Sequence, residues 1–294
     1  MFEKSGMDYS KKQLISFIGS AFAATGILFV SLKILDYGAD SDLFALDSFQ
    51  IFAFVALIFV CGLSNMILVL AWTNLLSFFG VSSCFRHNFS IYGLSQIAKY
   101  VPGNIFHLAS RHALGGAAGI SGGSLGKAAI FELMLIATAA STLSVLLAPI
   151  FFNRFSMLSS GLVSAGLLIL VVTLLARYFT LNIAYAFTCY TFFLSILGIL
   201  FLSVLTLLTT DLSLSVSNGT ILSSAFIFAW LVGLLTPGAP AGLGVREFVL
   251  LMLLENVVSE TELLRAVLYC RIMTAFGDIL FFLAALVLKL KKSV

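Results

Sequence analysis

Residues 234–257 read LLTPGAPAGLGVREFVLLMLLENV, an apolar segment that proline and glycine interrupt in its middle. Two prolines and several small residues prevent one continuous helix there, and Arg246-Glu247 opens a new helix after the break. At membrane depth, irregular backbone is tolerated only where protein buries it or where it lines a wet cavity. We therefore predict that residues 220–257 form a re-entrant hairpin of two short helices.

The rest of the chain has the composition of a membrane protein. Hydrophobic residues make up 61% of its 294 residues and charged residues only 10%, whereas soluble domains are about 45–50% apolar and about 25% charged. Runs of about 20 apolar residues mark membrane-spanning helices. We predict a single membrane domain, residues 1–294, with spans at about 13–35, 49–79, 123–152, 157–177, 182–208 and 263–288.

A second broken segment, residues 88–115, matches the first one. Its Pro102-Gly103 and the later Pro237-Gly238 lie 135 residues apart, and Arg111 and Arg246 are separated by the same 135 residues. Each half of the chain, about 10–154 and 155–290, then reads as span, span, hairpin, span.

Three crossings per half place the two halves in opposite orientations, which is the pattern of transporters with a site at the repeat interface. The predicted fold class is an all-α integral membrane protein of six transmembrane helices and two re-entrant hairpins in two inverted repeats.

Basic residues set the predicted orientation. They precede the first span, follow the second span and close the chain, so the positive-inside rule places both termini in the cytoplasm of a multi-pass protein of the cell membrane. The residues concerned are Lys4, Lys11, Lys12, Arg86, Lys289, Lys291 and Lys292.

Charged residues inside apolar segments are the candidates for a site. Each costs about 2.5–3.5 kcal/mol at the bilayer centre, so such residues face the interior of the bundle and pair or serve a function. Both interpretations stay open: structural ion pairs, or the lining of a cavity for a charged head group. The substrate-binding candidates are Lys99, Asn104, His107, Arg111, Glu132, Arg246, Glu247, Arg271 and Asp278.

Two local features favour an anionic ligand. Asn104, His107 and Arg111 follow one another at i, i+3 and i+7, which makes one polar stripe on a helix that starts after the break. The free backbone N–H groups of that start attract anions, and an arginine fork suits phosphate. The residues predicted to act as structural hinges are Pro102, Gly103, Pro237, Gly238, Pro240, Gly242 and Gly244.

No sequence motif for a nucleotide, a metal or a nucleic acid occurs, so we expect no cofactor and no metal. The four cysteines are scattered and form no C-x-x-C pair, and we interpret them as small core residues.

The motifs KYVPGN (99–104) and PAGLGVRE (240–247) resemble the transmembrane domain of lysylphosphatidylglycerol synthase/flippase proteins. Ala241 departs from the family, in which glycine is common at that position. Bifunctional members add a soluble aminoacyl-transferase domain, which we expect this chain to lack, so the resemblance implies only lipid translocation. The motif positions carried over are Pro102, Gly103, Pro240, Gly242, Gly244, Arg246 and Glu247.

We therefore expect a lipid flippase-like transporter for a membrane phospholipid or a polyprenyl-phosphate-linked lipid. Arg111 and Arg246 would hold phosphate, one from each half, and the three carboxylates would balance the arginines or contact a cationic head group.

Two alternatives stay open. One is an intramembrane enzyme that acts on a lipid-linked substrate, which would need a nucleophile or an acid–base pair, with Glu247 and His107 as candidates. The other is an accessory subunit that recruits a separate synthase. The identity of the lipid, the energy coupling and a homo-oligomeric state are open as well.

Overall fold

The computed structural model describes residues 46–100, 106–152, 154–209, 215–236, 242, 244–255 and 257–290. Within these residues all regular structure is helical.

Six of the described helical segments are long and apolar enough to cross a membrane, with mean hydropathies from 1.7 to 2.5. The chain is therefore an all-α, multi-pass membrane protein. The six segments are α2 (Ser48–Phe78), α5 with its continuation through η2 and α6 (Gly122–Phe151), α7 (Met157–Tyr178), α8 (Leu181–Leu208), α9 (Val216–Leu235) and α11 (Glu260–Leu290).

Five of these segments coincide with predicted spans, and the predicted span at 13–35 lies outside the described residues. The sixth, α9, differs from the prediction, because we assigned its residues to the short first leg of a hairpin. It runs for 20 residues without proline from its N-cap, Ser215, whose hydroxyl accepts a hydrogen bond from the Asn218 N–H at 3.2 Å. Helix α9 is thus long enough to span the membrane.

Four described helical pieces are too short to cross. They are α3 (Phe85–Gln96), η1 (Ile97–Tyr100), α4 (Phe106–Ala117) and α10 (Val245–Leu254), of 12, 4, 12 and 10 residues, against the roughly 20 that a crossing requires. The breaks at 101–105 and 237–241 lie outside the described residues, so the re-entrant path of both segments stays a prediction.

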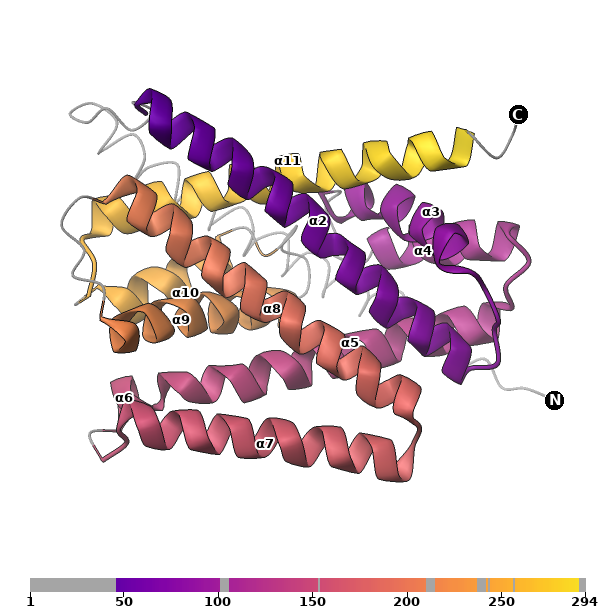
Figure 1. Ribbon diagram of the computed structural model, residues 1–294, viewed down its shortest axis with the longest axis horizontal. Coiled ribbons are helices and arrows are strands. Elements are labelled where there is room, and N and C mark those ends of the chain that lie inside the picture. Colours follow the sequence, from indigo (N-terminus) through magenta and orange to yellow (C-terminus); the bar gives the residue numbers. More distant parts are fainter. Residues whose placement is uncertain are drawn as a thin grey trace, which may run out of the picture.

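The two central helices, α2 and α8, lie side by side and run in opposite directions across the molecule (Figure 1). Helix α11 packs against α2 and α3, and α5 packs against α8 and α9. Helices α3 and α4 lie at one end of the molecule, and α9 and α10 lie at the other end (Figure 1). Helix α7 lies at the edge with most of its surface exposed, as expected for a helix that faces lipid.

Small residues allow α2 and α11 to pack closely. A Cβ atom on Gly62 of α2 would lie 3.0 Å from the carbonyl oxygen of Gly277 on α11. Backbones that approach this closely are typical of helix packing in membranes, where small residues replace the hydrophobic driving force. The contact fixes α11 against α2 immediately beside Asp278.

Candidate functional site

A cavity of about 300 Å³ lies where the two halves of the chain meet. This volume falls at the lower end of the range for small-ligand sites. Its walls come from α2, α3, η1, α4 and α5 of the first half and from α8, α9, α10 and α11 of the second. The predicted site residues that line it are Lys99, His107, Glu132, Arg246, Arg271 and Asp278.

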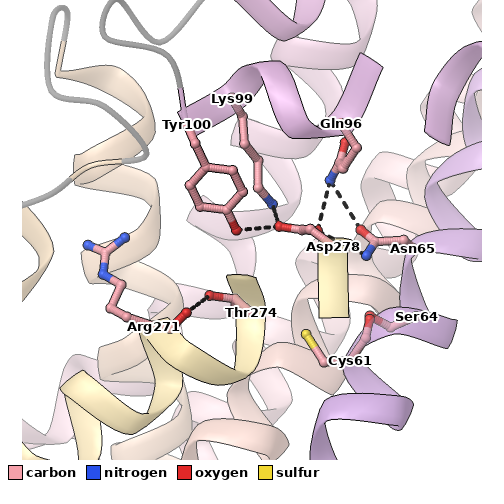
Figure 2. Close-up of polar contacts among 9 residues, drawn as sticks. All are labelled: Cys61, Ser64, Asn65, Gln96, Lys99, Tyr100, Arg271, Thr274 and Asp278. Carbon is pink, nitrogen blue, oxygen red and sulfur yellow. Dashed lines mark hydrogen bonds and ion pairs between the residues drawn. The ribbon is translucent and has the colours of Figure 1, made fainter. Parts of the chain in front are cut away.

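Asp278, on α11, is the centre of the largest polar cluster in this cavity (Figure 2). Its side chain is 3% exposed and pairs with the ammonium group of Lys99. The Tyr100 hydroxyl donates a hydrogen bond to Oδ2 at 2.5 Å. Nδ2 of Asn65 and Nε2 of Gln96 donate to Oδ1 at 3.1 and 3.4 Å. The buried carboxylate therefore has both a counter-ion and a full set of donors, as a buried charge requires.

Glu132, on α5, pairs with Arg111 on α4. The distance from Nη1 of Arg111 to Oε2 of Glu132 is 2.6 Å, and the two side chains are only 4% and 8% exposed. The Tyr92 hydroxyl donates to Oε1 of Glu132 at 2.9 Å. The same tyrosine ring lies under the guanidinium, with Cζ of Arg111 3.5 Å from its centroid. Glu132 reaches the cavity wall, whereas Arg111 does not line the cavity, and its Nε donates a hydrogen bond to the Ser95 hydroxyl at 3.3 Å.

Glu247, on α10, pairs with Arg271 on α11. Nε of Arg271 donates to Oε1 of Glu247 at 2.7 Å, and Nη2 lies 2.7 Å from the same oxygen. Nη2 also donates to the carbonyl oxygen of Gly242 at 3.1 Å. This pair therefore ties α11 both to α10 and to the residue that follows the second Pro-Gly break.

Arg246 differs from the other three cations at membrane depth because no carboxylate of the described residues forms an ion pair with it. Its side chain passes between two glycines: a Cβ atom on Gly233 or Gly242 would come within 2.8 or 2.7 Å of Nε. Cζ lies 5.4 Å from the centroid of the Trp230 ring, a cation–π distance. The side chain is thus held in a slot, and it lines the cavity.

The positions of the predicted hinge residues are known only in part. Gly242 and Gly244 have φ angles of 68° and 80°, which glycine adopts without strain, and Gly244 is the N-cap of α10. The remaining candidates lie outside the described residues: Asn104, Pro102, Gly103, Pro237, Gly238 and Pro240.

Sequence reasoning did not identify the uncharged polar part of the site. Asn65 and Gln96 are amides inside apolar segments, and that signal was available from the sequence. Tyr92, Tyr100 and Trp230 carried no such signal, because aromatic residues are common throughout this chain and only the packing of the helices turns these three toward charged groups.

The geometry defines a multi-pass membrane protein with a charged cavity at the meeting point of its two halves. No protein-family model matches the chain, and no curated protein sequence matches it at a significant level. The resemblance to lysylphosphatidylglycerol synthase/flippase proteins therefore stays a prediction that rests on the two motifs.

Proposed function

We propose that the protein is a flippase-like transporter that moves a polar, phosphate-bearing lipid head group between membrane leaflets. The observation that carries this proposal is an arginine without a carboxylate partner among the described residues, Arg246, on the wall of a cavity built from both halves of the chain. An arginine at membrane depth that has no protein counter-ion is a functional candidate, and an anionic ligand would complete its charge. The acyl or prenyl tails would remain in the bilayer.

The packing of the helices supports an inverted repeat, which is the architecture that such transport uses. We match α2 with α8, α3 with α9, α4 with α10 and α5 with α11, following the 135-residue offset between the Pro-Gly pairs. Under this exchange the contact of α11 with α2 becomes that of α5 with α8, and the contact of α11 with α3 becomes that of α5 with α9. The contact of α3 with α4 becomes that of α9 with α10. The matched helices α2 and α8 run in opposite directions (Figure 1), as inversion requires.

The same matching of helices relates two of the ion pairs, with the positions of the arginine and the glutamate exchanged. Arg111 of α4 pairs with Glu132 of α5, and in the matched helices Glu247 of α10 pairs with Arg271 of α11. Each half thus fastens its last short helix to the following long helix by one buried arginine–glutamate pair. The role of Arg111 in this proposal is consequently to hold Glu132, and the phosphate contact that we predicted for both arginines is left to Arg246.

Both broken segments fit re-entrant hairpins. Helices α3 and α4 lie together at one end, and α9 and α10 lie together at the opposite end (Figure 1). Because α10 has only 10 residues, it cannot carry the chain across a membrane after the break. The proposed path therefore enters and leaves the membrane on the same side.

The two ends of the molecule differ in charge, which supports the proposed orientation. The last turn of α11 carries Lys289 and that of α7 carries Arg177, whereas the first turn of α11 at the opposite end carries Glu260 and Glu262. By the positive-inside rule, the end with the basic residues faces the cytoplasm.

A cavity-filling variant tests the proposal. Ala275 lines the cavity, so Ala275→Trp places an indole in the proposed path of the head group. Purified protein in liposomes should expose a tail-labelled fluorescent phospholipid to a membrane-impermeant quencher faster than protein-free liposomes do. Ala275→Trp should remove that acceleration.

The matched control is Ala165→Trp, because Ala165 lies on the exposed surface of α7. This variant adds the same indole to the surface and should leave the rate unchanged. Equal rates for wild type, Ala275→Trp and protein-free liposomes, with wild type shown to be folded, would refute transport.

A further inference from the structure

We infer that the cavity selects lipids whose head group bears one net negative charge on a phosphodiester. This inference rests on the proposed function and names the substrate class of that site. It follows from the charges around the cavity, from the slot that holds the Arg246 side chain and from the absence of a described carboxylate paired with it.

The charges around the cavity do not sum to zero. Among the described residues, each of the three carboxylates at membrane depth is matched to one cation, and one cation remains. The breaks at 101–105 and 237–241 contain no acidic residue that would balance it. With histidine counted as neutral, the described residues around the cavity therefore carry a net charge of +1 in the absence of a ligand. The matched pairs are Lys99–Asp278, Arg111–Glu132 and Arg271–Glu247.

A buried excess charge is costly because the low-dielectric surroundings replace little of the lost hydration. A head group of net charge −1 brings the site to neutrality. A zwitterionic head group of net charge zero leaves the excess in place. A phosphomonoester carries about −1.5 to −2 at pH 7 and overshoots neutrality. Charge balance alone therefore favours a monoanionic head group over a zwitterionic head group and over a phosphomonoester.

The geometry of Arg246 favours a phosphodiester as the carrier of that charge. A phosphodiester has two unesterified oxygens, and one guanidinium fork binds two oxygens side by side. Only Arg246 offers a fork without a carboxylate among the described residues that line the cavity, since Arg271 is bound to Glu247. The glycines at 233 and 242 hold the side chain from both sides, so little rotamer freedom remains to be lost on binding.

The experiment compares three tail-labelled lipids in the same proteoliposomes: phosphatidylglycerol, phosphatidylethanolamine and phosphatidic acid. Wild type should move phosphatidylglycerol at least about tenfold faster than the other two, because a unit of unbalanced charge near Arg246 exceeds a tenfold effect at an effective dielectric constant of about 20.

Two variants separate charge from structure. Arg246→Gln removes the excess charge and should abolish the preference for phosphatidylglycerol over phosphatidylethanolamine, whereas Arg246→Lys keeps the charge and should retain part of the preference. Arg177→Gln removes an exposed arginine at the end of α7 and should leave the preference at the wild-type value. A merely structural role of Arg246 would lower the rates of all lipids together and leave their ratio unchanged.

The outcomes distinguish this inference from the proposed function. Equal acceleration of all three lipids by wild type overturns the charge selection and leaves transport intact. If wild type accelerates none of them, transport is refuted, and native mass spectrometry of the detergent-solubilised protein with the same lipids decides the inference. Preferential retention of phosphatidylglycerol that is lost in Arg246→Gln supports it, and equal retention of all three overturns it.

Discussion

Replacing Glu132 by glutamine removes the negative charge from the most deeply buried ion pair while keeping the shape of the side chain. The new amide would still accept the hydrogen bond from Tyr92, but Arg111 would lose the oxygen that lies 2.6 Å from its Nη1. The Arg111 side chain is 4% exposed, so water cannot replace the lost partner. We therefore expect Glu132→Gln to lower the free energy of unfolding markedly.

The size of the effect follows from the burial of both partners. Removing one member of a buried pair costs about 3–5 kcal/mol, because the other charge is left uncompensated. For a chain of this size, about 2–4 °C per kcal/mol gives a fall in Tm of roughly 6–20 °C. The double variant Arg111→Met/Glu132→Gln has no unpaired charge, so most of the loss should be recovered.

A thiol-reactive fluorescent dye measures Tm in detergent. Cys61, Cys189 and Cys270 are buried and become reactive on unfolding, and the exposed Cys84 sets the starting signal. Glu255→Gln removes an exposed carboxylate and should change the free energy of unfolding by less than about 0.5 kcal/mol. If Glu132→Gln were as stable as wild type, or if the double variant were no more stable than the single one, the buried pair would not have the proposed role.

Two further predictions concern glycines. Gly242→Ala should lower stability by about 1–3 kcal/mol and slow transport, because φ is 68° and the new Cβ would lie 2.7 Å from Nε of Arg246; Gly126→Ala, with nothing within 4 Å, serves as its control in the dye assay. Gly277→Ala should cost about 1–3 kcal/mol by the same assay, because its Cβ would lie 3.0 Å from the backbone nitrogen of Gly62. Gly161→Ala, on the open surface of α7, should be neutral, and a Gly277→Ala variant of wild-type stability would contradict the close contact of α2 and α11.

Much of the fold was predictable because hydropathy is a local property. The spans that became α2, α5, α7, α8 and α11 are long, predominantly apolar runs, and a helix satisfies its backbone polar groups within the segment at membrane depth. The residues of α9 were predicted to form a short leg because they lead directly into the break at Pro237. The start of α9 depends on the Ser215 cap, which left room for a full 20 residues.

The candidate site was predictable as a set of residue types but not as a set of partners. Membrane-embedded charges are rare enough that their positions can be read from the chain, and six of the nine predicted residues line one cavity. Their pairing was not available, because it depends on contacts between segments far apart in sequence. Tyr100 and Asp278, which share a hydrogen bond, are 178 positions apart.

The sequence by itself determined that the chain is helical, that it lies in a membrane, and that its apolar segments contain the carboxylates Glu132, Glu247 and Asp278 together with cations such as Lys99, Arg111, Arg246 and Arg271. Only the tertiary structure decided which charges neutralise one another. Ion pairing falls off over a few ångströms, so the packing of η1 and α10 against α11, and of α4 against α5, selects the partners. The resulting pairs leave Arg246 on the cavity wall without a carboxylate partner among the described residues. This is the reason why we propose Arg246 as the binding site for an anionic head group.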